Sequence, residues 1–226
     1  MKKIVLIVGS ILVLLSGCTV WSFYPLYTKD TLVLNDEILG TWVTTSNSFN
    51  GDDVLIWTFS RKAEKWVKKK NNNIDRGTHQ EKNKYTYKLD VMHEGDSNSM
   101  AEFKVHIVKI GDNYYLDFHT ENYELNNSML VLHLMPVHTF AKARFGEELT
   151  LEWFDFDWFE DLIKNNKIRI KHEENRDNIV LTARPEELQK FVLKYGNDTS
   201  AFEDGINYVL QKQIESETLT KHDQNN

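Results

Sequence analysis

Four of the eight histidines lie where neighbouring strands could bring their imidazoles together. They are His106, His119, His133 and His138, and Asp117 lies on the same predicted strand face as His119. Imidazole and carboxylate groups bind zinc, but a zinc site needs three or four ligands that converge at about 2.0–2.3 Å. The register between strands cannot be read from spacing, and structural histidines are common. We therefore predict no metal ligand and keep a metal site as the alternative.

A second candidate for chemistry is a group of acidic residues set among aromatic side chains. Asp155, Asp157, Glu160 and Asp161 lie in or beside the aromatic-rich stretch 153–159, and glycosidases use paired carboxylates. However, Asp157 and Glu160 also have the spacing of a capping box at a helix start, where negative charge is favourable. The sequence contains no G-x-S-x-G motif and no Gly-rich phosphate loop. We predict no enzyme, no catalytic residue and no cofactor.

The N-terminus has the pattern of an export signal. Lys2 and Lys3 precede an apolar run from Ile4 to Leu15. The run has the length of a signal-peptide core and is shorter than the roughly 20 residues of a spanning helix. It ends in Leu15-Ser16-Gly17-Cys18, which resembles the lipobox of bacterial lipoproteins. The resemblance implies removal of residues 1–17, acylation of Cys18 with chains such as palmitate, and attachment to a membrane of the bacterial cell envelope.

The remaining chain is acidic and can form no internal disulfide. Cys18 is the only cysteine, although an exported domain enters a compartment that allows disulfides. Loss of Lys2 and Lys3 with the signal changes the formal charge from −7 to −9, which argues against nucleic acid as a partner. Thr19 is not the aspartate that retains some lipoproteins at the inner membrane, which favours the outer membrane. An ordinary secretory peptide that ends near a cysteine is the alternative.

Between residues 38 and 154 the dominant hydrophobic period is two, which is typical of strands with one buried face. Apolar and polar residues alternate over 85–91, 103–107, 114–118 and 149–153. Gly111-Asp112-Asn113 has the composition of a hairpin turn. We predict a mainly β protein with some α structure, in which an antiparallel meander closes into a barrel or curls into a half-barrel. The aromatic-rich residues 18–37 are expected to form the anchor and a tether.

The segment 155–215 mixes helix and strand signals. The predicted elements are a helix from Asp157, strands over 167–172 and 178–183, and a helix from Pro185 to a C-cap at Gly196. Proline is favoured at the first helical position and glycine beyond the last. We predict that this α-β-β-α segment packs on the barrel and that residues 216–226 form a polar, disordered tail.

Two other stretches depart from the strand alternation. Residues 129–135 are apolar at both parities except for His133, which is typical of a strand covered on both faces. Residues 61–83 are rich in Lys, Arg and Asn. We interpret them as a solvated loop between two strands. The alternative is a basic patch that contacts anionic lipid headgroups.

Two resemblances concern the exported domain. Gly40-Thr41-Trp42 resembles the G-x-W motif of lipocalins, in which the tryptophan closes the base of the barrel. More of the chain resembles a group of uncharacterised bacterial lipoproteins, a resemblance that implies no activity. It rests on Tyr24-Pro25-Leu26-Tyr27-Thr28, Leu39-Gly40-Thr41-Trp42, residues 132–140, and Leu181-Thr182-Ala183 followed by Glu186-Glu187-Leu188.

These observations leave two hypotheses for function. The first is a membrane-anchored binding protein whose barrel holds a hydrophobic or amphipathic ligand such as a lipid. Trp42, Trp57 and His133 are then the candidate ligand-binding residues. The second is a structural or interaction protein of the envelope, with a filled core, a protein partner and no small-molecule ligand. A cavity of about 300 Å³ or more would favour the first hypothesis.

Overall fold

The computed structural model describes residues 19–47, 53–61, 84–122, 134–175 and 178–213. Within these ranges the chain forms twelve strands, two α-helices and two short 3-10 helices. Neither described helix is long and apolar enough to cross a membrane. Cys18, His133, most of the basic stretch 61–83 and the tail 216–226 lie outside the described residues.

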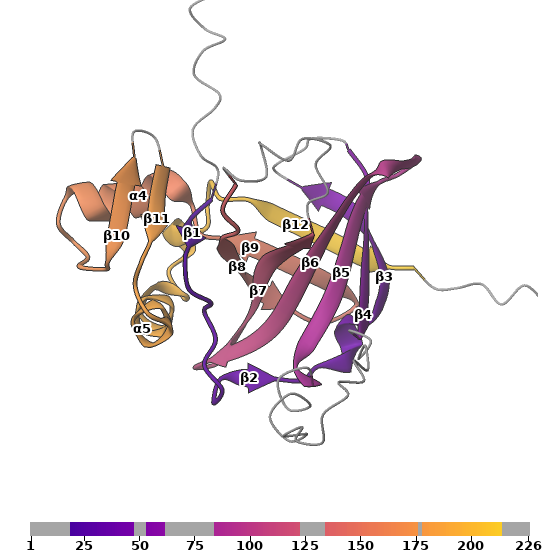
Figure 1. Cartoon of the computed structure of the whole chain (residues 1–226), viewed down its shortest axis with the longest axis horizontal. Coiled ribbons are helices and arrows are strands. Elements are labelled where there is room, and N and C mark those ends of the chain that lie inside the picture. The colour runs from indigo at the N-terminus through magenta and orange to yellow at the C-terminus, as the bar shows by residue number, and fades with distance from the viewer. Residues whose placement is uncertain (1–18, 48–52, 62–83, 123–133, 176–177, 214–226) are drawn as a thin grey trace, which may run out of the picture.

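Eight strands form a closed antiparallel barrel of the general lipocalin kind (Figure 1). Seven follow one another as a meander, and β12 pairs with both β9 and β3 to close the ring. The strands are β3 (Gly40–Asn47), β4 (Leu55–Arg61), β5 (Thr86–His93), β6 (Asp96–Ile110), β7 (Asn113–Asn122), β8 (His138–Arg144), β9 (Glu148–Trp153) and β12 (Asn207–Lys212). The predicted mainly β, barrel-forming meander is confirmed, and the barrel is closed.

Alternation along each strand fills the barrel, because successive side chains of a strand face opposite sides. On β4, Leu55, Trp57 and Phe59 are buried, and the residues between them are partly exposed. The β6–β7 turn joins the paired residues 110 and 113. Gly111 in this turn has a φ of +60°, the left-handed value that tight hairpin turns require. The predicted hairpin turn is therefore confirmed.

The chain before β3 closes the base of the barrel. The 3-10 helix η1 (Asp36–Ile38) contributes the fully buried Ile38. Just before it, β2 (Leu32–Val33) pairs with β6 at Val108 and Ile107. Trp42 Nε1 donates a hydrogen bond to the Ile38 carbonyl over 2.8 Å. Trp42 thus closes the base, the position that the Gly40-Thr41-Trp42 motif led us to expect.

A second layer packs on one side of the barrel (Figure 1). It contains β1 (Trp21–Ser22), α4 (Phe156–Lys164), β10 (His172–Asn175), β11 (Asn178–Leu181), α5 (Pro185–Tyr195) and the 3-10 helix η2 (Thr199–Ala201). β1 joins the two layers, because Ser22 pairs with His138 of β8 and with Leu181 of β11. Val20 and Leu26 of this segment are buried in the second layer, whereas Phe23 and Tyr24 are exposed.

Three boundaries within 155–215 differ from the prediction. The α4 cap is Asp155, whose Oδ1 accepts from the Trp158 N–H over 3.0 Å, and not Asp157. The first strand of the pair is β10, so it begins where the predicted strand 167–172 was expected to end. β12 lies within the predicted α-β-β-α segment but belongs to the barrel. Its pairing partners β3 and β9 are remote in sequence, which local patterns do not reveal.

The second helix begins as predicted, with Pro185 in its first turn. Gly196 is its C-cap, but its φ of −65° is right-handed, so no left-handed turn explains the glycine. Only glycine fits at this position, because a Cβ at Gly196 would collide with the Tyr115 hydroxyl and the Val192 carbonyl. Gly196 thus lets α5 end directly against β7.

Candidate functional site

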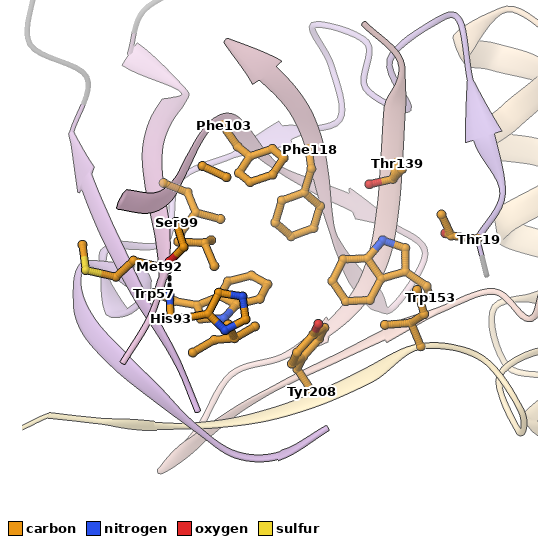
Figure 2. A pocket seen from close by; sticks show the side chains of 15 residues that line it. Thr19, Trp57, Met92, His93, Ser99, Phe103, Phe118, Thr139, Trp153 and Tyr208 are labelled. Atoms are coloured by element: carbon orange, nitrogen blue, oxygen red, sulfur yellow. Dashed lines mark hydrogen bonds between the residues drawn. The ribbon is translucent and has the colours of Figure 1, made fainter. Parts of the chain in front are cut away.

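A cavity of about 320 Å³ lies inside the barrel, and its wall includes Trp57 but not Trp42, the cross-strand neighbour of Trp57. Its wall is mostly apolar, with contributions from seven barrel strands and from the chain at Thr19 (Figure 2). The lining residues are Thr19, Leu55, Trp57, Leu89, Val91, Met92, His93, Ser99, Ala101, Phe103, Phe118, Thr139, Trp153, Ile206 and Tyr208. The lower part of the barrel is filled by side chains such as Ile38 and Tyr87.

Five of the fifteen residues that line the cavity are Phe, Trp or Tyr, and their rings pack against one another. Phe118 stacks on Trp153 with ring centroids 5.3 Å apart, and Trp57 packs on Tyr208 at 5.2 Å. Trp57 and Phe118 meet edge to face at 6.3 Å. Aromatic pairs prefer these offset and edge-to-face geometries. The wall is therefore built from mutually supporting rings that surround a hollow.

Two polar atoms in this wall have no hydrogen-bond partner among the described residues. They are the Trp57 indole N–H and the Thr19 hydroxyl, and both are buried. An unpaired buried polar group costs about 1–3 kcal/mol, so such groups are uncommon in a filled core. Burial raises the pKa of Tyr208 to about 12, so this phenol stays neutral. The wall is mostly apolar and also includes His93, whose Nδ1 lies 4.0 Å from the Asp53 carboxylate.

The structure separates the three predicted ligand-binding residues. Trp57 lines the cavity, as predicted. Trp42 does not, because its indole is used in the closed base, where Lys212 Nζ lies 5.1 Å from its ring centroid. His133 lies outside the described residues. Ligand binding by Trp42 stays a prediction, and Trp42 is the cross-strand neighbour of Trp57 without itself lining the cavity.

Several other residues of the cavity wall were not named in the prediction. Phe118 and Trp153 belong to stretches with the right alternation, so parity could have indicated them. Tyr208 could not be found in this way, since β12 was not recognised as a barrel strand. Thr19 was considered only for its place after Cys18.

The predicted histidine cluster is a structural junction. Asp117 is fully buried. Its Oδ2 accepts a hydrogen bond from the Leu26 N–H over 2.7 Å, and its Oδ1 lies 2.8 Å from His138 Nδ1. Burial raises the pKa of Asp117, and the contacts to His138 and Leu26 oppose that rise. The rings of His119 and His138 are 4.5 Å apart. Asp117 thereby fastens the N-terminal segment to the barrel wall.

His106 lies apart from this pair, with its ring 4.2 Å from the Tyr27 ring and its Nε2 3.0 Å from Thr86 Oγ1. In the described part of the chain, no three His, Cys, Asp or Glu side chains gather as a metal site would require. Among the four clustered acids, Asp155 caps α4 and Glu160 pairs with Lys164 at 2.6 Å. These two carboxylates stabilise the helix.

No protein-family model matches the sequence, and no curated protein and no solved structure matches it either.

Proposed function

We propose that this protein is a membrane-anchored lipoprotein of the bacterial envelope, attached through acylated Cys18, that binds a hydrophobic or amphipathic ligand inside its barrel. The outer membrane is the favoured location. The observation that carries the proposal is the apolar cavity of about 320 Å³ with the buried, unpaired Trp57 N–H in its wall.

The size of the cavity limits the ligand. Ligand sites span about 300–1,000 Å³, and 320 Å³ lies at the lower end of that range. This volume suits one hydrocarbon chain and is small for a whole two-chain lipid. Each methylene that enters the cavity contributes about 0.8 kcal/mol, so even a partly inserted chain binds measurably.

The unpaired donor adds a chemical requirement. An indole N–H can only donate, so a ligand that reaches this buried atom would pair with it through an acceptor such as a carbonyl, hydroxyl or carboxylate oxygen. One such hydrogen bond contributes about 1 kcal/mol. A single-chain amphiphile with an oxygen-bearing group, such as a fatty acid, meets both requirements.

The proposal can be tested on the soluble form that begins at Thr19. We expect it to bind a fluorescent single-chain fatty acid with one-to-one stoichiometry and to release it when unlabelled fatty acid is added. Ala101→Trp, which fills the cavity from β6, should weaken binding about tenfold, because it removes burial of about two methylenes.

Met100→Trp is the matched control, since Met100 is 48% exposed beside Ala101 and is not part of the cavity wall. This variant should bind the probe normally. The proposal is wrong if the unmodified soluble form binds no probe, or if both variants bind it equally well. That result would favour the structural or interaction role.

A further inference from the structure

The start of the described chain forms part of the cavity wall. Thr19 lines the cavity, and its hydroxyl is buried there. Cys18 is joined to Thr19 by a peptide bond, which places their Cα atoms about 3.8 Å apart. On the proposed function, Cys18 carries the acyl chains that enter the bilayer. The covalent anchor and the cavity are therefore at the same end of the barrel.

Charged residues are paired at the base of the barrel, and two adjacent apolar residues are exposed near its mouth. At the base, Arg61 pairs with Asp36, and Lys212 Nζ donates to the Glu37 carbonyl over 2.9 Å. Near the cavity, Met135 is 56% exposed and Leu134 is 42% exposed. These two residues lead into β8, whose second residue Thr139 lines the cavity. Exposed apolar residues beside a lipid attachment point suit contact with a bilayer.

From these observations we infer that the cavity mouth faces the bilayer on its β1–β8 side and takes a single hydrocarbon chain directly from a membrane lipid. The inference rests on the proposed acylation of Cys18 and deepens the proposed function. The β5–β6 turn carries the exposed Glu94 and Asp96, so this acidic side of the rim faces the headgroups and water. The bilayer contacts the side that holds Thr19 and Met135.

The geometry of the barrel makes this orientation measurable. In Figure 1, β1 begins at the upper end of the barrel, and β2 lies at its lower end. Along β6, Met100 near the mouth and Val108 beside β2 are eight residues apart, a span of about 26 Å at about 3.3 Å per residue. Interfacial segments enter a bilayer by only about 5–10 Å. A probe at the mouth and a probe at the base therefore cannot both reach the acyl region.

The test uses the full, lipidated chain in phosphatidylethanolamine/phosphatidylglycerol vesicles that contain lipids with spin-labelled chains. Met135→Cys and Leu34→Cys are labelled separately with an environment-sensitive fluorophore. Leu34 is a matched control, because it is 40% exposed and directly follows β2 at the base. A thioether at Cys18 leaves the engineered cysteine as the only thiol.

We expect quenching at position 135 to exceed quenching at position 34 by at least about threefold, because only the mouth enters the interface. Equal quenching at both positions, or stronger quenching at position 34, overturns the inference. Fatty-acid binding by the soluble form is unaffected by that outcome, so a wrong orientation is distinguished from a wrong function. Conversely, quenching confined to position 135 in a protein that binds no fatty acid would reject the function and leave the orientation standing.

Discussion

The protein has two hydrophobic cores, and they are filled to different degrees. The outer core, between the barrel and the second layer, packs Phe154 against Phe202 and Phe191 with ring centroids 4.5 and 5.2 Å apart. Its neighbouring buried carboxylate, Asp117, has partners for both oxygens. The barrel core instead contains an empty volume of about 320 Å³.

The aromatic packing of the outer core indicates that the cavity does not reflect poor packing throughout the fold. The chain fills its outer core and also fills the base of the barrel around Trp42. Protein interiors normally reach the density of organic crystals. We attribute the cavity beside Trp57 to ligand binding.

The largest expected effect compares the two cores directly. Phe154→Ala should lower the free energy of unfolding by about 4 kcal/mol, because it opens a cavity in a filled core. Phe118→Ala should cost about half as much, since one side of that ring already faces empty space and loses few contacts. Urea unfolding of the soluble form measures both values. Equal losses would show that the barrel is filled in solution, contrary to the comparison.

A smaller loss is expected at the buried carboxylate of the outer junction. Asp117→Ala should destabilise the fold by about 3 kcal/mol, because the Leu26 N–H and His138 lose a buried partner. Chemical denaturation measures the loss. Glu160→Ala removes a partly exposed helical ion pair and should change stability by no more than about 0.5 kcal/mol. An Asp117→Ala loss as small as that of Glu160→Ala would contradict the role of Asp117 in fastening the layers.

Asp117→Asn separates packing from charge at the same position. Burial raises the pKa of Asp117 in the folded protein, so the folded state holds this proton more tightly than the unfolded state. The resulting stabilisation is complete below the unfolded pKa of about 3.9 and is lost as the pH rises through the folded pKa. Asp117→Asn should therefore flatten the decline in unfolding free energy over that window, as measured by denaturation at a series of pH values.

In the cavity wall, only a small effect on stability is expected. Trp57→Phe removes an N–H that has no partner among the described residues, so its cost should stay below about 1 kcal/mol. The same change should weaken fatty-acid binding about fivefold, because the ligand loses one hydrogen bond. Probe displacement measures this loss. Unchanged affinity would show that the indole N–H does not bind the ligand.

Local patterns were sufficient for most of the barrel. Alternation identified the strands around Tyr87, Val105 and Leu116, and Gly111 identified a turn, because side-chain period and turn chemistry are local properties. β12 was not predicted as a barrel strand, because its neighbours in the barrel are remote in sequence. Val209, for example, lies beside Thr45, which is 164 residues away. The sequence predicted Asp157 as the cap of α4, whereas the observed cap is Asp155. Both side chains can accept from a first-turn N–H, so local sequence does not decide between them.

The site was less predictable than the fold. Trp57 lines the cavity and its cross-strand neighbour Trp42 does not, because a cavity depends on how side-chain volumes add up in space. The contacts of Asp117, His106 and His138 could not be predicted from local patterns either. Their proximity was expected from neighbouring strands, but register decided that His138 faces Asp117 and that His106 faces Tyr27.

The most direct test is ¹⁹F NMR of the soluble form labelled with 5-fluorotryptophan, with resonances assigned from single Trp→Phe variants. On addition of a fatty acid, we expect the signals of Trp57 and Trp153 to shift together, saturating at one ligand per chain, and to shift more than the signal of Trp42, which does not line the cavity. If neither cavity tryptophan responds, or if Trp42 responds in their place, the barrel does not bind its ligand where we propose.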